Sequence, residues 1–328
     1  MISVIIPTRN RAELLSETLT SLKGQTLSSD LFEVLVVDNG STDETRDVTL
    51  NFQKNLNNLR YVFAPVPGLH EGRHRGMKEA RYELLVFADD DIQATPDWLF
   101  SYYEVFQDPS AAMAGGNNIP LYLEPAPSWL KNIWDVSLSN GMRLIPQLSV
   151  LEVYSDINEI DPQFVWGCNF AIRKKILIAA GGFHPDGMPK ESIKYRGDGE
   201  THVANYVSQN NLKCNFHPKA TVFHKVTAGR MTPEYFYQRG FSQGISDSYS
   251  QLRLARVNSN NKRRKSLKLI LSRVFEKIRR TIFLELEAKK VLLEYKRGTK
   301  DGYNFHQECY FRDQYLKIWV HKSDYFSM

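Results

Sequence analysis

The stretches LLVFADDD, at residues 84–91, and FEVLVVDNGSTD, at residues 32–43, decide the fold class. Each is a short apolar run that ends abruptly in acidic or amide residues. Runs that are apolar at every position are typical of strands covered on both faces, as in a parallel sheet. Residues 3–6 and 61–64 have a similar, mostly apolar composition. We therefore expect four parallel strands in the first ninety or so residues.

Helical segments separate these runs. Asn10 with Glu13, and Ser41 with Glu44, have the form of capping boxes, in which polar side chains satisfy the backbone at the start of a helix. After the first box, one apolar stripe is formed by Leu14, Leu15, Leu19 and Leu22. This alternation predicts a Rossmann-like, doubly wound α/β fold with a mostly parallel sheet. Residues 164–225 resume the pattern, so we expect the sheet to continue there.

The length of 328 residues and the hydrophobic content of 42% allow one large core or two moderate ones, and they exclude a disordered protein. No run approaches the roughly 18 apolar residues of a membrane-spanning helix. The first residues, MISVIIPTRN, do not form a secretory signal, so we expect a cytoplasmic protein. The cysteines lack CxxC spacing, which predicts free thiols at Cys168, Cys214 and Cys309.

Charge is distributed unevenly along the chain. Residues 251–300 hold 16 Lys and Arg against four Glu, a balance of +12, so the net charge of +5 leaves −7 for the rest. An acidic body with a basic segment suggests an enzyme domain joined to a part that meets an anionic surface. We expect a catalytic domain over residues 1–230, with a donor half (1–115) and an acceptor half (116–230), and a helical, basic extension over residues 231–328.

Polar or charged residues follow three of the predicted strands. In an open parallel sheet, ligands bind outside the carboxyl ends of the strands. The residues at these ends are Pro7, Thr8 and Arg9 after the first strand, Asp38 after the second, and Asp89, Asp90 and Asp91 after the fourth. Carboxylates at two strand ends, with an arginine at a third, can hold a nucleoside and a divalent cation beside phosphates. Neither GxGxxG nor GxxxxGKS/T is present, which argues against dinucleotide-binding and P-loop proteins.

Five motifs occur in one order across residues 1–225: SVIIPTRNR, FEVLVVDNGSTD, GRHRGMKEA, LLVFADDD and, downstream, GDGE with a later ATVFH. With this set the chain resembles the family 2 glycosyltransferases, which have the GT-A fold. The resemblance implies a donor site for a nucleotide sugar made of Pro7, Thr8, Arg9, Asp38, Arg73, Asp89 and Asp90. It also implies a DxD-type site for Mn²⁺ or Mg²⁺ with the ligands Asp91, Asp89 and His224.

A base must act from the opposite face of the sugar, because the acceptor hydroxyl has to lose a proton as the diphosphate leaves. The candidates are Glu200 and Asp198 in RGDGETHV. The family pattern has Glu and Asp together, and this sequence departs from it. Pro218 and His224 match the downstream Pro and His of the family, and counting back from them places Glu200 where the resemblance implies the base, with Asp198 as the alternative. Residues that precede the helix expected to flank the acceptor cleft are Trp166, Gly167 and Asn169.

Residues 262–283, KRRKSLKLILSRVFEKIRRTIF, predict a basic amphipathic helix. Such a helix can lie on an anionic membrane, pack on the catalytic domain or pair in a homodimer. These alternatives stay open, and we expect no nucleic acid partner. A membrane contact would place the protein peripherally on the cytoplasmic face, within reach of a lipid-linked acceptor.

The motifs and the resemblance together predict an inverting glycosyltransferase. We expect it to move a sugar from a nucleoside-diphosphate sugar, with a UDP-sugar favoured, to a hydroxyl of a glycan or lipid-linked acceptor in cell-surface polysaccharide or glycolipid synthesis. Inversion follows from the resemblance and not from spacing. A sugar-phosphate nucleotidyltransferase would need a glycine-rich loop, which PTRNRAELL lacks. The unusual GDGE keeps one rival open, a catalytically degenerate protein that binds nucleotide sugars or serves as a membrane scaffold.

Overall fold

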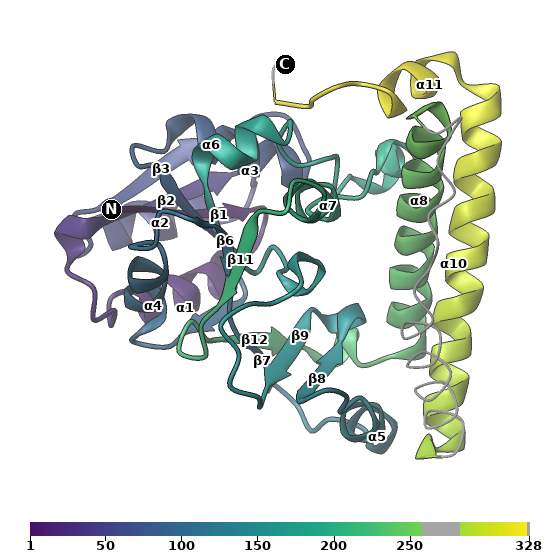
Figure 1. Ribbon diagram of the computed structural model, residues 1–328, viewed down its shortest axis with the longest axis horizontal. Coiled ribbons are helices and arrows are strands. Elements are labelled where there is room, and N and C mark those ends of the chain that lie inside the picture. The colour runs from purple at the N-terminus through teal and green to yellow at the C-terminus, as the bar shows by residue number, and fades with distance from the viewer. Residues whose placement is uncertain (258–282, 327–328) are drawn as a thin grey trace. The chain divides into compact units, whose positions relative to one another are not determined.

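The computed structural model describes residues 1–257 and 283–326 (Figure 1). A seven-stranded sheet forms the centre of its N-terminal part. In spatial order the strands are β11 (Lys213–Phe216), β6 (Ala111–Gly115), β10 (Asn169–Arg173), β4 (Leu84–Ala88), β1 (Ile2–Thr8), β2 (Phe32–Asp38) and β3 (Leu59–Phe63). Strands β1 to β4 pair in parallel, whereas β10 runs antiparallel to both β4 and β6. The predicted α/β class with a mostly parallel sheet is confirmed.

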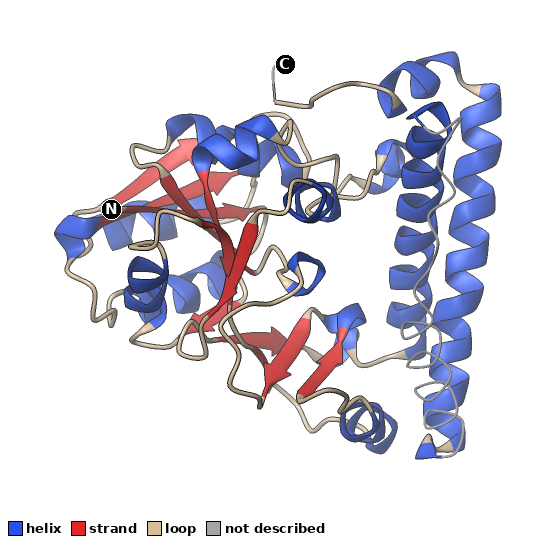
Figure 2. Cartoon of the chain, viewed as in Figure 1, coloured by secondary structure: helices blue, strands red, loops and turns tan. Residues whose placement is uncertain are grey.

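Helices cover both faces of this sheet (Figure 2). They are α1 (Ala12–Leu22), α2 (Thr45–Gln53), α3 (Leu69–Glu79), α4 (Trp98–Val105), α6 (Lys174–Ala179) and α7 (Thr201–Gln209). The leucine stripe of α1 joins one core with Val4 and Ile6 of β1. Ile5 points to the opposite face, because side chains alternate along a strand. There α3 approaches so closely that a Cβ on Gly76 would lie 2.3 Å from Ile5 Cγ2.

Both predicted capping boxes are wrong. Asn10 has a φ of 54°, and its Oδ1 accepts a hydrogen bond from the backbone N–H of Thr42. Asp43 serves both helix starts instead: its carboxylate accepts hydrogen bonds from the N–H groups of Ala12 and Thr45. One carboxylate has two oxygens, so it can satisfy two helices at once, which a hydroxyl does less well. This joins the loops that follow β1 and β2.

A smaller group of strands lies beside the loop that follows β4. It contains β5 (Ile92–Ala94), β12 (Val222–Val226) and β7 (Asn118–Tyr122) in that order, and β5 pairs with β12 antiparallel. The register sets His224 opposite Ile92, the residue directly after Asp91. Strand pairing therefore brings a histidine from late in the chain next to the acidic loop.

The chain divides into two compact units. The first comprises Met1–Leu121, Asp156–Lys225 and Lys322–Met328, and the second comprises Tyr122–Ser155 and Val226–His321. The second unit thus combines most of the expected helical extension with residues 122–155, which the sequence analysis placed in the acceptor half. The first unit includes the end of the chain.

The second unit contains two long helices, α8 (Pro233–Val257) and α10 (Leu286–Arg312). They run in the same direction, because Gly240 lies against Tyr295 and Gly244 against Thr299 (Figure 1). A Cβ would lie 1.9–2.1 Å from a backbone oxygen of the other helix at Gly240, Gly244, Gly298 and Gly302. The remaining elements of this unit include α5 (Ser128–Val136), β8 (Met142–Ile145), β9 (Val150–Val153) and α11 (Gln314–Val320). Short 3-10 turns in the two units span Ser29–Leu31, Pro146–Leu148, Pro162–Phe164, Lys190–Tyr195 and Ala228–Arg230.

A helical C-terminal region is therefore confirmed. The predicted basic helix at 262–283 lies outside the described residues except for its last position. Within residues 1–257 and 283–326, no helix combines the length and apolarity that crossing a membrane requires. All three cysteines are free thiols, as predicted, and Cys168 and Cys214 are buried.

Candidate active site

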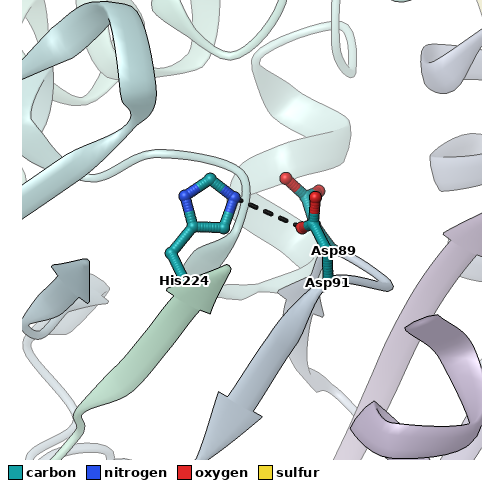
Figure 3. A group of neighbouring side chains, drawn as sticks. All are labelled: Asp89, Asp91 and His224. Atoms are coloured by element: carbon teal, nitrogen blue, oxygen red, sulfur yellow. Dashed lines mark ion pairs between the residues drawn. The ribbon is translucent and has the colours of Figure 1, made fainter. Parts of the chain in front are cut away.

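Three potential metal ligands converge where β4 ends and β12 passes. One nitrogen or oxygen atom from each of Asp89, Asp91 and His224 lies within 4.8 Å of the others. Nε2 of His224 is 3.2 Å from Oδ1 of Asp91, and Figure 3 shows the imidazole directed at the two carboxylates. Two carboxylates and one imidazole are donors that suit Mn²⁺ and, less closely, Mg²⁺. The three predicted metal ligands therefore lie together and fit a divalent cation.

Asp90 faces away from this group. Its carboxylate accepts hydrogen bonds from Thr8 Oγ1 at 2.7 Å and from Arg11 Nη1 at 2.5 Å, and Arg11 also reaches Asp91 Oδ2 at 3.2 Å. Burial raises the pKa of Asp90 to about 6, although Arg11 favours the charged form. The sequence interpretation named Arg9, which is exposed, and missed Arg11. Arg11 comes directly before α1, and the pairing of β1 with β4 brings it to Asp90.

Arg73 of α3 joins the two acidic parts of the site. Its side chain is 2% exposed, and its guanidinium lies 3.6 Å from Asp89 Oδ1 and 3.3 Å from Glu200 Oε2. Burial lowers the pKa of Arg73, but attraction to Glu200 and Asp89 outweighs this, so its pKa lies above the ordinary value. Phe183 packs its ring against the guanidinium at 5.2 Å. Arg73 is therefore a fixed cation between two carboxylates.

Gly167 makes room for this arginine. A Cβ at Gly167 would lie 1.9 Å from Arg73 Nη2, so no larger residue fits without moving the guanidinium. The backbone N–H of Gly167 also donates to Glu200 Oε1 at 3.4 Å. Of the predicted acceptor residues, Gly167 is thus the one that touches both charged groups.

The two candidate bases point to different neighbours. Glu200, at the start of α7, faces Arg73 and Gly167 and is partly exposed. Asp198 points instead to His184, with its Oδ1 2.5 Å from Nδ1 of the histidine. Glu200 shares the Arg73 cation with Asp89, so the geometry favours Glu200 as the carboxylate of the site.

Asp38 is oriented by two donors at the end of β2. The backbone N–H of Ser41 donates to its Oδ1 at 2.8 Å, and the hydroxyl of Tyr61 donates to its Oδ2 at 2.7 Å. Burial, helped by the bond to Asp38, raises the pKa of Tyr61 to about 12. Pro7 lies one strand away and would contact a Cβ on Gly72 at 3.0 Å. The predicted donor residues Pro7, Thr8 and Asp38 therefore lie on adjoining strand ends.

Asn169 and Trp166 are set apart from these groups. The Asn169 amide is buried, accepts hydrogen bonds from Trp98 and Tyr102, and donates to Ala220 O at 2.9 Å. Trp166 is half-buried and donates from Nε1 to Gln163 O. The described contacts use Asn169 inside the core, whereas Trp166 keeps part of its surface open.

Comparisons with known proteins show the family of the chain. The glycosyl transferase family 2 model matches residues 3–179. Validoxylamine A glucosyltransferase of Streptomyces hygroscopicus subsp. jinggangensis is 40% identical over 114 residues, which cover 34% of this chain and 27% of that protein. Poly(ribitol-phosphate) beta-glucosyltransferase of Bacillus spizizenii is 28% identical over 169 residues, covering 50% and 23%. The chain thus spans about a quarter of the length of these relatives.

Solved structures show the same fold. A mannosyltransferase from Pyrobaculum calidifontis, PcManGT, in complex with GDP-Man and Mn²⁺, superposes with a TM-score of 0.55 at 16% identity, over 97% of this chain and 82% of that one. GalNAc-T7 with UDP, GalNAc and Mn²⁺ gives 0.51 at 17% identity, over 72% and 45%. These neighbours confirm the expected GT-A fold. Because the family model covers more than half of its residues, the chain belongs to glycosyl transferase family 2.

Proposed function

We propose that the protein is an inverting glycosyltransferase that moves a sugar from a nucleoside-diphosphate sugar to a hydroxyl of a glycan or lipid-linked acceptor. The observation that carries this proposal is the group Asp89, Asp91 and His224 with a separate carboxylate, Glu200, across Arg73. A cation site and a base on different loops are what the transfer requires. The relatives that act in glycan synthesis support an acceptor of this kind in cell-surface polysaccharide or glycolipid assembly.

In this proposal Asp91, Asp89 and His224 hold Mn²⁺ or Mg²⁺. The bound cation would neutralise the negative charge that develops on the leaving diphosphate. Support comes from the donor set and from two structural neighbours that contain Mn²⁺ with a nucleotide or nucleotide sugar. Arg73 would add a second positive charge on the same side, and Asp90 would keep Arg11 and Thr8 in place behind the ligands.

Glu200 is the proposed base. The acceptor oxygen forms its new bond to the sugar as the bond to the diphosphate breaks, and Glu200 takes the hydroxyl proton. Its second neighbour, the Gly167 N–H, would hold the carboxylate in one orientation. Asp198, two residues earlier, is the alternative base. Its support is weaker, because its carboxylate faces His184. Trp166, beside Gly167, would contact the acceptor through its open surface.

The nucleotide of the donor would lie over the ends of β1 and β2, against Pro7, Thr8, Arg9 and Asp38. A UDP-sugar remains the favoured donor, and the sugar it carries is open to test. A thermal-shift panel of UDP, GDP, dTDP and CMP, each with and without Mn²⁺, tests the site directly. We expect one nucleotide to stabilise the protein only with Mn²⁺, and Asp91→Ala to abolish this. The exposed Asp47, on α2, provides the control Asp47→Ala, which should respond like the wild type.

No stabilisation by any of the four nucleotides at millimolar concentration would contradict the proposal. Stabilisation without turnover of any nucleotide sugar would instead favour a degenerate binding protein. A retained anomeric configuration in the product, observed by NMR, would contradict inversion while leaving the transfer itself intact.

We also propose a peripheral contact with anionic membrane at the cytoplasmic face, through the basic stretch around residues 262–283. The support is the sequence charge, with 16 basic residues against four acidic ones over residues 251–300. Liposomes that contain anionic lipid should bind the wild type. They should not bind the variant in which Arg263, Arg264 and Lys265 are all replaced by Glu. Equal binding by both proteins would argue for the alternatives, packing on protein or a homodimer, which sedimentation would reveal.

A further inference from the structure

The last described residues of the chain, 322–326, belong to the first unit, and the segment is anchored there by one buried side chain. Tyr325 is fully buried. Its ring meets His184 edge to face with the centroids 5.5 Å apart, and it meets His70 of α3 at 6.4 Å. A tyrosine that is fully buried and meets two histidine rings is a specific contact, because aromatic pairs add to the stabilisation that burial gives.

Two glycines leave the space that this segment occupies. A Cβ on Gly182 would lie 2.6 Å from the Phe326 ring, and a Cβ on Gly181 would lie 3.0 Å from Ser323 O. Gly181 has a φ of 87° and Gly182 a φ of 76°, which other residues rarely adopt. The turn between α6 and His184 is thus shaped to leave space for residues 323–326.

His184 holds the loop that carries both candidate bases. Besides its contact with Asp198, its backbone N–H donates to Gly199 O at 3.2 Å. Its ring stacks on His202, in the first turn of α7, with the centroids 3.6 Å apart. His202 is fixed in turn by Ala180 O, 2.6 Å from its Nε2. The His184 imidazole therefore contacts Asp198 before Glu200 and His202 after it.

We infer that Tyr325 and His184 are positioning residues for Glu200. Tyr325 holds the His184 ring, His184 holds Asp198 and His202, and the loop between them presents Glu200 to Arg73. The turn has little slack, since Gly199 has a φ of 54° and lies against Asp186, where a Cβ would meet Oδ2 at 3.0 Å. The inference rests on the proposed role of Glu200 as the base. It makes the segment 322–326 a part of the structure that supports the active site.

Hydrogen exchange tests this without any substrate. In Tyr325→Ala, we expect the amides of residues 198–203 to exchange about tenfold faster, while those of β1 and β2 keep their wild-type rates. Tyr325→Phe retains the ring and should restore rates to within about twofold. Phe311→Ala removes an aromatic ring of α10 that is 67% exposed, and it should leave residues 198–203 unchanged.

Kinetics give the second readout. With the nucleotide sugar that the wild type turns over, Tyr325→Ala should lower kcat about tenfold and change the donor KM less than twofold, because positioning acts on the base and not on donor binding. Binding of UDP with Mn²⁺ should stay within about twofold of the wild type. If the wild type turns over no nucleotide sugar, the proposed function fails, whereas the exchange data still decide the positioning role.

Unchanged exchange at residues 198–203 in Tyr325→Ala would overturn the inference. Equal acceleration in β1 and β2 would overturn it as well, because Tyr325 would then support the whole unit. Asp198→Asn offers an independent variant: the loop should loosen while residues 323–326 keep their protection. A loop that stays protected in Asp198→Asn would break the proposed chain of contacts.

Discussion

Two acidic loops face Arg73, and they are held in different ways. Residues 89–91 follow directly from the buried strand β4, and the paired strands β5 and β12 set His224 beside them. Residues 197–200 precede a helix and are fixed by side chains, through His184 and Asp198. The sheet gives the first loop its geometry, since strand ends in a parallel sheet have little freedom. The second loop depends on a histidine and a tyrosine that lie outside it.

This difference suits the proposed chemistry. A cation site must be rigid, because its ligands have to stay within narrow distances of one ion. A loop that presents a base must hold its carboxylate in line with the acceptor hydroxyl, and here side chains from outside the loop fix it. The contrast predicts that changes in the first loop act on metal and nucleotide binding, whereas changes around the second act on turnover.

The largest effect is expected from Glu200→Gln. Gln keeps the shape and the contact with Gly167 but cannot accept the hydroxyl proton, so kcat should fall by about 10²–10⁴-fold. Binding of UDP with Mn²⁺, measured by calorimetry, should remain within about threefold, because the first loop is untouched. The paired variant Asp198→Asn should lower kcat less. A larger loss in Asp198→Asn would exchange the two assignments.

Gly167→Ala should disturb both loops through one atom. The new Cβ would have to displace the Arg73 guanidinium, which lies 1.9 Å away, from Asp89 and Glu200. A shift of about 1 Å in a charged group of the site costs about 10²-fold in turnover, and overpacking costs about 1–3 kcal/mol of stability. Gly24→Ala is the control, since its nearest neighbour is Ser21 O at 3.7 Å. Similar kinetics for the two variants would show that Arg73 is free to relocate.

Arg11→Ala should weaken the first loop alone. It leaves the buried Asp90 with Thr8 as its remaining described hydrogen-bond donor to the side chain, and it removes a cation from Asp91. Because the Arg11 side chain is 37% exposed, solvent screening reduces the expected loss to about 1–2 kcal/mol in urea unfolding. Arg9→Ala, at an exposed position, should stay within about 0.5 kcal/mol. Faster exchange at residues 198–203 in Arg11→Ala would blur the distinction between the loops.

The smallest expected effect is a pH dependence of the free energy of unfolding, caused by His74. Burial lowers the pKa of His74 from 6.5 to about 3, and His74 packs on Phe326. The unfolded chain therefore binds the proton first, and stability falls as the pH drops below 6.5. Between pH 6.5 and 5.5 this group should cost about 1 kcal/mol, and His74→Gln should remove that part of the slope. Equal slopes in urea unfolding would assign the acid sensitivity to other groups.

The sequence predicted the first loop well and the second loop only in part. Asp89, Asp90 and Asp91 end an apolar run, and a strand end is a place that periodicity can locate. Arg11 was missed because its contact with Asp90 joins residues 79 positions apart, which only the β1–β4 pairing brings together. His184 and Tyr325 carry no local pattern at all. Their roles come from packing between distant segments, and a single sequence contains no periodic signal for such packing.

The glycine-lined contact between α8 and α10 has an electrical consequence. Because these helices run in the same direction at close range, their dipoles add, so one end of the pair is partly positive and the other partly negative. Charged residues of the opposite sign lie at these ends. Glu287 is in the first turn of α10 and Arg312 in its last, and Glu234 is in the first turn of α8. The backbone of the pair is thus polarised along its length, and these charged side chains offset the partial charge at its ends.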